Sequence, residues 1–480
     1  MTVNFSQMPA TRRTPGRYIE LNKVLVGRGL SPTTVTVLFI GQRLGSGVKS
    51  ALDLVQVLSE ADAKSYFGRG SVLARAITAA FGANKGLNAY AMALDDHASG
   101  VAHVQETTIS GPAVGDGALT VFVAGDRVEV AYSDGDTAAT VATAVAAAIS
   151  TTLTPDLPMT VEVDGVTAEQ LNWTARNDGT LGGQIDITFS FPDGSGLSVV
   201  SAVGTPGATD PALSDALDLV ETEDFDFIVS TLNDATNLGL LETHLADLVH
   251  PLVSLGAVGV FATTGTYGAA TTLAANFATS GFMTGGFITG TKTWSAELAG
   301  IYAGLLASQD DPAMPYNNLP LTGVHVPESV GDRLTAAEVE AALNAGVAPF
   351  VVGAGNKVRI VRAITTYTQN DAAESDDVFL DVTVARTLFW WRAQVVAMLA
   401  LKYPRSKNTA ARREAIRIDI ISLAKQAEQL EILENVDELE DGFIVETNGS
   451  DSSRVDLITP IDIVNGLHIL AGRIDMTQSL

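Results

Sequence analysis

The chain of 480 residues contains no cysteine. This absence excludes disulfide bonds, a thiolate nucleophile and any zinc site built on cysteine. Hydrophobic residues make up 46% of the sequence, which is enough for the packed cores of roughly two to four domains. We therefore expect the fold to be stabilised by packing and by assembly.

Long apolar runs are also missing. The N-terminus has no continuous apolar segment of the kind found in a secretory signal, and no window approaches the ~20 apolar residues of a membrane span. The best candidate, Ala393 to Leu401, is too short and lies between Arg392 and Lys402. We expect a chain that is made in the cytoplasm and does not insert into membranes.

The sequence lacks the common catalytic motifs. The six histidines show no spacing typical of metal ligands, and neither a G-x-S-x-G elbow nor a dinucleotide fingerprint occurs. The stretch Gly41 to Ser50 invites comparison with a phosphate-binding loop, but Val48 separates Gly47 from Lys49, and the backbone of such a loop needs glycine beside lysine. We expect no catalytic residue, no cofactor and no metal site, which favours a structural protein.

Positive charge is scarce in the middle of the chain. Residues 91–250 hold 25 acidic side chains against only Arg127 and Arg176, whereas residues 386–425 hold nine lysines and arginines against Glu414 and Asp419. An acidic exterior with one basic element argues against direct nucleic-acid binding and indicates an acidic partner at that element. The alternative for the basic cluster alone is a solvated helix face.

The hydrophobic periodicity predicts a multidomain α/β (α+β) fold. Residues 1–34 are mostly polar, with scattered glycine and proline, which is typical of an extended arm with short β pieces such as Tyr18 to Leu21. Residues 35–94 and 211–365 alternate apolar strands with helical segments, which predicts a mixed sheet covered by helices. Residues 95–210 show short alternating runs between turns and predict an acidic, mostly-β domain inserted into this layer.

The last domain, residues 366–480, is expected to contain two long helices followed by β-strands. Apolar residues spaced by three and four predict a first helix over Val384 to Tyr403, which Pro404 ends. A second apolar stripe runs from Ile416 to Leu430, after Asn408 and Thr409, either of which can cap a helix.

The charges of this second helix run against the helix dipole. Arginines lie near its positive N-terminal end, and four glutamates are predicted at its negative C-terminal end, namely Glu428, Glu431, Glu434 and Glu438. A partner outside the helix explains this order. We predict that the cations that meet this partner are Arg405, Lys407, Arg412, Arg413 and Arg417.

After Gly442 the period becomes that of strands. The alternation predicts a hairpin of Phe443 to Thr447 and Val455 to Thr459, and a last apolar run extends from Leu467 to Met476. Because this run is too apolar to lie in water, we predict that the chain ends add strands to neighbouring subunits. The residues expected to take part are Tyr18, Ile19, Leu21, Phe443, Val445, Val455, Leu457, Leu467 and Ile469.

Several of these segments resemble the tail sheath proteins of Mu-like contractile bacteriophages. The resemblance covers residues 14–42 and 380–476. The stretches that carry it are Thr14 to Glu20, Arg28 to Leu30 and Val37 to Gln42 near the N-terminus, and Lys402 to Lys407, Asp456 to Pro460 and Asp462 to Leu467 near the C-terminus.

The resemblance implies a virion subunit that is assembled in the host cytoplasm. Members of this family stack in six-fold rings as a helical sheath around a tail tube, with C-terminal domains that face the tube and inserted domains on the outside. Contraction of the metastable sheath drives the tube through the host envelope without nucleotide. The implied partners are further copies of the chain, the tube protein, and the baseplate and tail terminator proteins.

The residues leave two alternatives open. One is another structural virion protein, such as a tube or capsid subunit, although the terminal motifs do not suit it. The other is a carbohydrate-active or nucleotide-binding enzyme built on the α/β layer.

Overall fold

The computed structural model describes residues 35–152 and 156–476. Tyr18, Ile19 and Leu21, predicted to add a strand to a neighbour, lie outside the described residues. The described chain forms two compact units. The larger unit contains residues 35–393 and 463–476, and the smaller unit contains residues 394–462. Within these ranges no helix is both long enough and apolar enough to cross a membrane.

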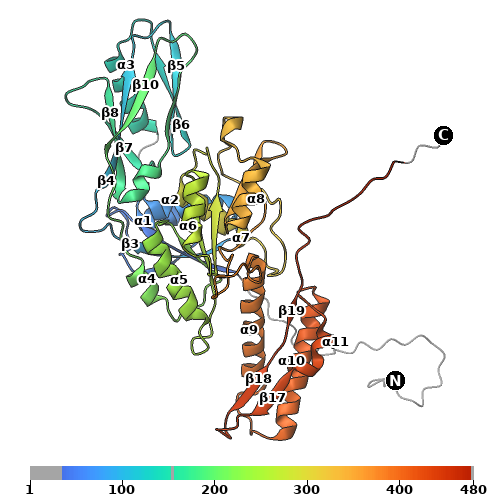
Figure 1. Ribbon diagram of the computed structural model, residues 1–480. Helices are drawn as coiled ribbons and strands as arrows, with labels where there is room; N and C mark the ends of the chain where they lie inside the picture. The colour runs from blue at the N-terminus through green and yellow to red at the C-terminus, as the bar shows by residue number, and fades with distance from the viewer. Residues whose placement is uncertain (1–34, 153–155, 477–480) are drawn as a thin grey trace, which may run out of the picture. The chain divides into compact units, whose positions relative to one another are not determined.

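An eight-stranded sheet lies at the centre of the larger unit (Figure 1). Its order is β15-β14-β13-β12-β11-β1-β3-β2, and all neighbouring strands are parallel except the two edge strands, β2 and β15. The central strand β1 is buried because its sequence, TVLFIGQ, is almost continuously apolar. The strands are β1 (Thr36–Gln42), β2 (Leu54–Val57), β3 (Asn88–Leu94), β11 (Phe227–Ser230), β12 (Val258–Thr263), β13 (Met283–Phe287), β14 (Ala348–Gly353) and β15 (Lys357–Ile360).

Helices cover both faces of this sheet. Helices α2 (Val72–Ala83) and α7 (Ser295–Leu306) pack over the face that carries Phe39, whereas α5 (Ala235–Val249) packs over the face that carries Leu38. The remaining helices of the layer are α1 (Glu60–Phe67), α4 (Ser214–Leu219), α6 (Tyr267–Ala275), α8 (Ala336–Asn344) and the short 3₁₀ helix η2 (Val330–Asp332). The predicted mixed sheet covered by helices is confirmed.

The residues between β3 and α4 form two further sheets around helix α3 (Ala138–Thr152). Trp173 is fully buried between them, and its indole N–H donates a hydrogen bond to Thr107 Oγ1 at 2.8 Å. That these residues face outward in an assembly stays a prediction. One sheet has the order β10-β4-β8-β7 and the other β6-β5-β9, with β4 (Ala102–Ser110), β5 (Gly117–Val123), β6 (Asp126–Tyr132), β7 (Met159–Val163), β8 (Gln170–Asp178), η1 (Thr180–Gln184), β9 (Ile187–Ser190) and β10 (Ser198–Thr205).

Helix α9 (Val382–Lys402) begins in the larger unit and ends in the smaller one, where α10 (Ala410–Gln429) follows it. These are the two long helices predicted from the sequence. The other elements of this part of the chain are β16 (Leu433–Glu434), α11 (Val436–Leu439), η3 (Glu440–Gly442), β17 (Ile444–Thr447), β18 (Val455–Ile458) and β19 (Asp462–Ile463).

The second long helix is shorter than predicted. The backbone turns out of the helix after Gln429, and Glu431 and Asn435 both adopt left-handed conformations with φ of 58° and 57°. Glu434 and Glu438 therefore lie beyond α10, in β16 and α11. Glu431 lies beyond α10 as well, so the prediction of four glutamates at the C-terminal end of this helix is wrong for three of them and holds only for Glu428.

Candidate assembly surfaces

The N-terminal end of α10 carries the cations that the sequence assigns to a partner. Thr409 caps this end, since its hydroxyl accepts a hydrogen bond from the Arg412 N–H at 3.2 Å. Arg405, Lys407 and Arg412 are exposed. Within the described part of the chain, no carboxylate forms an ion pair with these three residues or with Arg413, whose guanidinium donates to Asn408 Oδ1 at 2.7 Å. These four cations can therefore form ion pairs with an acidic group of another molecule.

Contacts between α9 and α10 fix the turn that carries Arg405 and Lys407. Lys402 donates a hydrogen bond to Asp419 at 2.8 Å, and the Tyr403 hydroxyl donates to the same carboxylate. Burial, together with the negative charge of Asp419, raises the pKa of Tyr403 to about 12. The turn is thus tied to Asp419 in the third turn of α10, which holds the cations of the turn in place.

Arg417 differs from the other four cations. Its guanidinium donates hydrogen bonds to the Glu440 and Phe443 carbonyls, each at 2.8 Å, and its side chain is only 25% exposed. These bonds fix the segment that leads into β17. Arg417 is therefore occupied within its own unit, and the predicted contact with a partner falls mainly to the other four residues.

The predicted hairpin is present. Strand β17 pairs with β18 in antiparallel register, with Val445 opposite Leu457 and Thr447 opposite Val455. Phe443, which was predicted as part of the strand, lies one residue before it and is buried. This hairpin is a two-stranded sheet in the described structure, so its outer edges offer backbone N–H and C=O groups to a further strand.

The C-terminal tail, residues 467–476, forms neither helix nor strand (Figure 1). Leu467, Ile469 and Ile474 are 73%, 80% and 97% exposed. His468 holds the start of the tail, because its ring lies 2.8 Å from the Asn317 side chain and 3.5 Å from the Asp381 carboxylate. Exposed apolar residues of this density are unusual for a segment in water, and they favour burial against another molecule.

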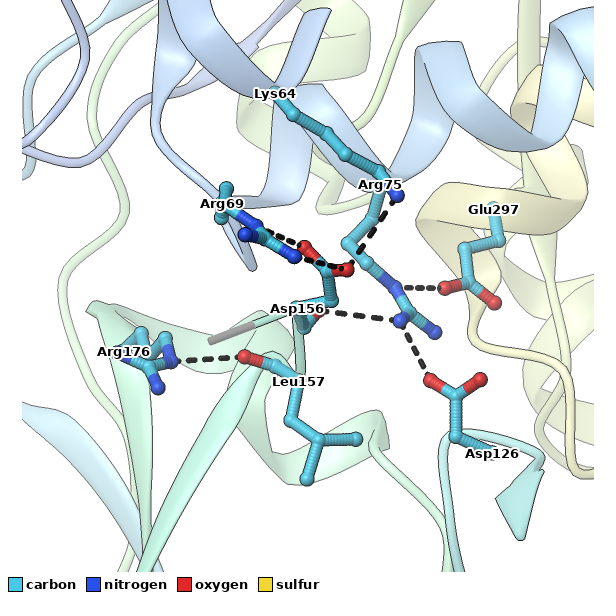
Figure 2. A network of polar contacts seen from close by, with 8 residues as sticks. All are labelled: Lys64, Arg69, Arg75, Asp126, Asp156, Leu157, Arg176 and Glu297. Carbon is cyan, nitrogen blue, oxygen red and sulfur yellow. Dashed lines mark hydrogen bonds and ion pairs between the residues drawn. The ribbon is translucent and has the colours of Figure 1, made fainter. Parts of the chain in front are cut away.

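A network of ion pairs joins the inserted sheets to the helices of the α/β layer (Figure 2). Arg75 of α2 donates hydrogen bonds to Glu297 of α7 at 2.5 Å and to Asp126 of β6 at 2.6 Å. Asp156 accepts two hydrogen bonds from Arg69, at 2.7 and 2.8 Å, and lies 3.5 Å from Lys64. We call these six residues the junction network.

Burial decides how strongly each part of this network acts. The Arg75 and Glu297 side chains are only 15% and 10% exposed. Burial raises the pKa of Glu297, and Arg75 opposes this increase. The Arg69 side chain is 53% exposed, and its hydrogen bonds lower the pKa of Asp156. Removal of one partner of the buried pair leaves an uncompensated buried charge and is therefore costly. The exposed pair is screened by water and contributes little to stability.

The junction network was not predicted from the sequence, although two signals were available. Arg75 is the only charged residue of the apolar helix α2, VLARAITAAFGA, and Glu297 is the only charged residue of the apolar helix α7, SAELAGIYAGLL. A single charge of opposite sign on each of two buried helices predicts an ion pair between them. Among the described residues, no group of three or more metal-ligating side chains is arranged to hold a metal ion.

Two family models match the chain. One, described as the phage tail sheath protein central domain, matches residues 206–366, and the other, described as the phage tail sheath C-terminal domain, matches residues 374–477. Together they cover more than half of the sequence. The chain belongs to the phage tail sheath protein family. The C-terminal model of this family spans α10, the hairpin and the C-terminal tail, whereas residues 95–205 lie outside both models.

Similar proteins span more than nine-tenths of this sheath-family chain. The Mu-like prophage FluMu tail sheath protein of Haemophilus influenzae is 28% identical over 489 residues, which cover 98% of this chain and 99% of the relative. Among solved structures, the sheath tail protein of Desulfitobacterium hafniense has 16% identity and a TM-score of 0.53, with 94% of this chain and 97% of that chain covered. The sheath tail protein of Listeria innocua has 14% identity and a TM-score of 0.52, with 91% and 93% covered. At this identity the two structures show a shared fold.

Proposed function

We propose that this chain is the structural subunit of a contractile tail sheath. Copies of the chain polymerise as stacked six-fold rings around a tail tube, and contraction of the polymer drives the tube through the host envelope. The subunit is part of the virion tail and assembles in the cytoplasm of the host bacterium. Its partners are further copies, the tube protein, and the baseplate and tail terminator proteins.

The observation that carries this proposal is the similarity to the Haemophilus influenzae tail sheath protein along the whole chain. The two family models support it, because they match the second part of the α/β layer and the C-terminal segment in the order expected of a sheath subunit. The same matches speak against an enzyme, since the relatives are named as sheath proteins and not as catalysts.

The basic end of α10 is the surface proposed to meet the tube. An acidic belt on the tube would pair with Arg405, Lys407, Arg412 and Arg413. Each subunit of a ring presents the same four cations to the tube. Exposed pairs contribute only about 0–1 kcal/mol each, but repetition around a ring multiplies their effect.

The chain ends are proposed to link subunits by strand addition. The hairpin has open edges that accept a further strand, and the C-terminal tail carries exposed apolar side chains that such a strand would bury. Tyr18, Ile19 and Leu21 are the proposed strand of the N-terminal arm. Backbone hydrogen bonds of this kind hold neighbours together while the subunit bodies rotate during contraction.

Electron microscopy of the purified full-length chain tests the proposal. A sheath subunit is expected to form long hollow tubes, because each copy carries the contacts needed for stacking. A stable small particle that turns over a substrate would instead support the alternative of an α/β enzyme.

A further inference from the structure

An open pocket of about 690 Å³ lies beside α1 in the larger unit, and its charged lining is entirely basic. Lys64 and Arg69 contribute from α1 and the loop that follows it, and Arg176 contributes from β8 of the inserted sheets. Ser46 and Ser65 add hydroxyl groups. We call this site the basic pocket. A basic pocket is unexpected in a chain whose net charge is −26.

The positive charge of the basic pocket is only partly compensated. Asp156 pairs with both Arg69 and Lys64, so that one carboxylate serves two cations. Arg176 donates its Nε–H to the Leu157 carbonyl at 2.8 Å (Figure 2), and no described carboxylate forms an ion pair with it. Burial lowers the pKa of Arg176. Three cations against one carboxylate leave a surplus of two positive charges for a ligand.

The backbone around the basic pocket is already engaged, which limits the kind of anion that it binds. The N–H groups of Val48 and Lys49 donate to the Ser65 and Tyr66 carbonyls, both at 3.1 Å. A Cβ on Gly47 would lie 2.4 Å from the Tyr66 carbonyl oxygen, so the two segments are in direct contact. These amides are not free to surround a phosphate. The basic pocket offers side-chain cations, which suit a carboxylate.

The same unit carries an exposed loop with the opposite charge. The acidic loop, residues 370–377, contains four carboxylates, of which Asp371, Glu374 and Asp377 are exposed and form no ion pair with any described cation. Its shape is fixed, because the Asn370 Oδ1 accepts hydrogen bonds from the Ala372 and Glu374 N–H groups, both at 3.0 Å. No hydrogen bond or ion pair within the described residues joins the acidic loop to the basic pocket.

We propose that the basic pocket receives the acidic loop of a second copy of this chain. The proposal rests on the proposed function, since a polymer of identical acidic subunits needs local pairs of opposite charge where its copies meet. Complementary charge of this kind fixes the register between copies and opposes mispairing.

Charge reversal at Arg176 tests the contact. The variant Arg176→Glu is expected to lower the fraction of chain in polymers about tenfold at moderate salt, because it places like charges opposite each other. Arg127→Glu is the matched control, since Arg127 is the other cation of residues 91–250, is 58% exposed and pairs with Glu129 of its own strand. The control is expected to polymerise like the unmodified chain. Circular dichroism and melting establish that each variant is folded, and Arg176→Gln replaces Arg176→Glu if the latter does not fold.

Charge reversal in the acidic loop tests whether this loop is the segment that the basic pocket binds. The variant Asp371→Lys with Glu374→Lys is expected to impair polymers on its own and to restore them when combined with Arg176→Glu. Polymers of Arg176→Glu that equal those of the unmodified chain would overturn the proposal. The proposal would also be overturned if the combined variant formed no more polymer than Arg176→Glu alone. A block by inorganic phosphate that sodium chloride does not reproduce at equal ionic strength would show a small-anion site and would also overturn it.

A second measurement separates this contact from the proposed function. If the unmodified chain forms no tubes, the proposed function fails. Sedimentation velocity at low salt then still tests the contact, because it measures self-association of the chain. Arg176→Glu is then expected to lower this association, and the combined variant is expected to restore it. An unmodified chain that sediments as a monomer at low salt would contradict the contact.

Discussion

At the scale of single residues, the surroundings of each guanidinium separate the arginines that serve the fold from those that are free for a partner. Arg417 donates to two carbonyls of its own unit, whereas Arg412 is exposed and lies 5.6 Å from the Tyr403 ring centre. Sequence alone assigns both to one surface, because it shows charge and spacing but not the carbonyls that a folded chain brings to Arg417.

The first prediction concerns Arg412 and Arg413. Reversal of both to glutamate is expected to reduce the number of sheathed tubes several-fold and to leave the melting temperature of the subunit near its original value, since neither residue forms an ion pair within the described chain. Electron microscopy of sheath assembled on tubes measures the effect. The double variant Arg127→Glu with Lys357→Glu is the control, since it reverses the same number of positive charges elsewhere. Sheathed tubes that form in equal number and resist salt as before would contradict the role of α10.

The second prediction concerns the buried pair of Arg75 and Glu297. Glu297→Ala leaves a buried guanidinium with Asp126 as its remaining ion-pair partner, and it is expected to destabilise the larger unit by about 3 kcal/mol. Asp156→Asn weakens the more exposed pair with Arg69 and is expected to cost less than about 1 kcal/mol. Chemical denaturation compares the two variants. Equal losses would show that burial does not decide the strength of the junction network.

At the scale of elements, helix starts were the most predictable feature. Thr409 was one of two residues expected to cap the second long helix, and it accepts the capping hydrogen bond from the residue three positions later. The end of α10 was not predictable from its pattern, because Leu430 continues the apolar spacing while left-handed conformations at Glu431 and Asn435 turn the chain away. Nothing in the spacing signals the turn at Glu431, since this position is neither a glycine nor an asparagine.

Two strands of the inserted sheets, β8 and β10, are hard to detect from the sequence pattern. Strand β8, QLNWTARND, alternates buried and half-buried residues, but its half-buried face carries Asn172 and Asp178, which are typical of turns in a sequence. Strand β10 is an edge strand that is exposed on nearly every residue, so it has no apolar face to detect. Its pairing with β4 defines it, and pairing is a long-range property.

The third prediction belongs to the N-terminal arm. Deletion of residues 1–21 is expected to leave a folded monomer with near-normal circular dichroism and melting that no longer forms tubes, because the deletion removes the strand proposed to complete a neighbour's hairpin. Deletion of residues 1–13, which ends before Tyr18, serves as the control and is expected to retain tubes. Normal tubes from the longer deletion would refute the linking role. Loss of the folded monomer would assign the arm to the core of its own subunit.

At the scale of the whole molecule, the inserted sheets and the α/β layer share one continuous hydrophobic core in the larger unit. This core includes Leu38 of β1, Trp173 of β8 and Leu241 of α5. Hydrogen bonds cross the same junction, from the Trp294 indole to the Leu181 carbonyl at 3.0 Å and from the Asn177 amide to the Arg43 carbonyl at 2.9 Å. An interface of this kind couples the folding of the two parts.

The fourth prediction follows from this coupling. The inserted sheets and the α/β layer are expected to unfold in one transition, as measured by native-state hydrogen exchange of β8 and β12 on heating or in denaturant. Glu297→Ala removes the buried partner of Arg75, whose guanidinium also pairs with Asp126 of the inserted sheets. It is therefore expected to weaken the junction network and to lower the protection of both strands together. Protection that falls in β8 alone would show that the inserted sheets unfold independently of the layer.

The account is tested most directly in the phage or prophage that encodes this chain. A stop codon is placed in the coding sequence, and the particles that then form are imaged by electron microscopy. This experiment tests the role of the subunit without any assumption about its surfaces. The account predicts tail tubes with baseplates and no sheath, and it predicts that a copy of the gene supplied in trans restores sheathed tails. Sheathed, contractile tails made in the absence of this chain would contradict it.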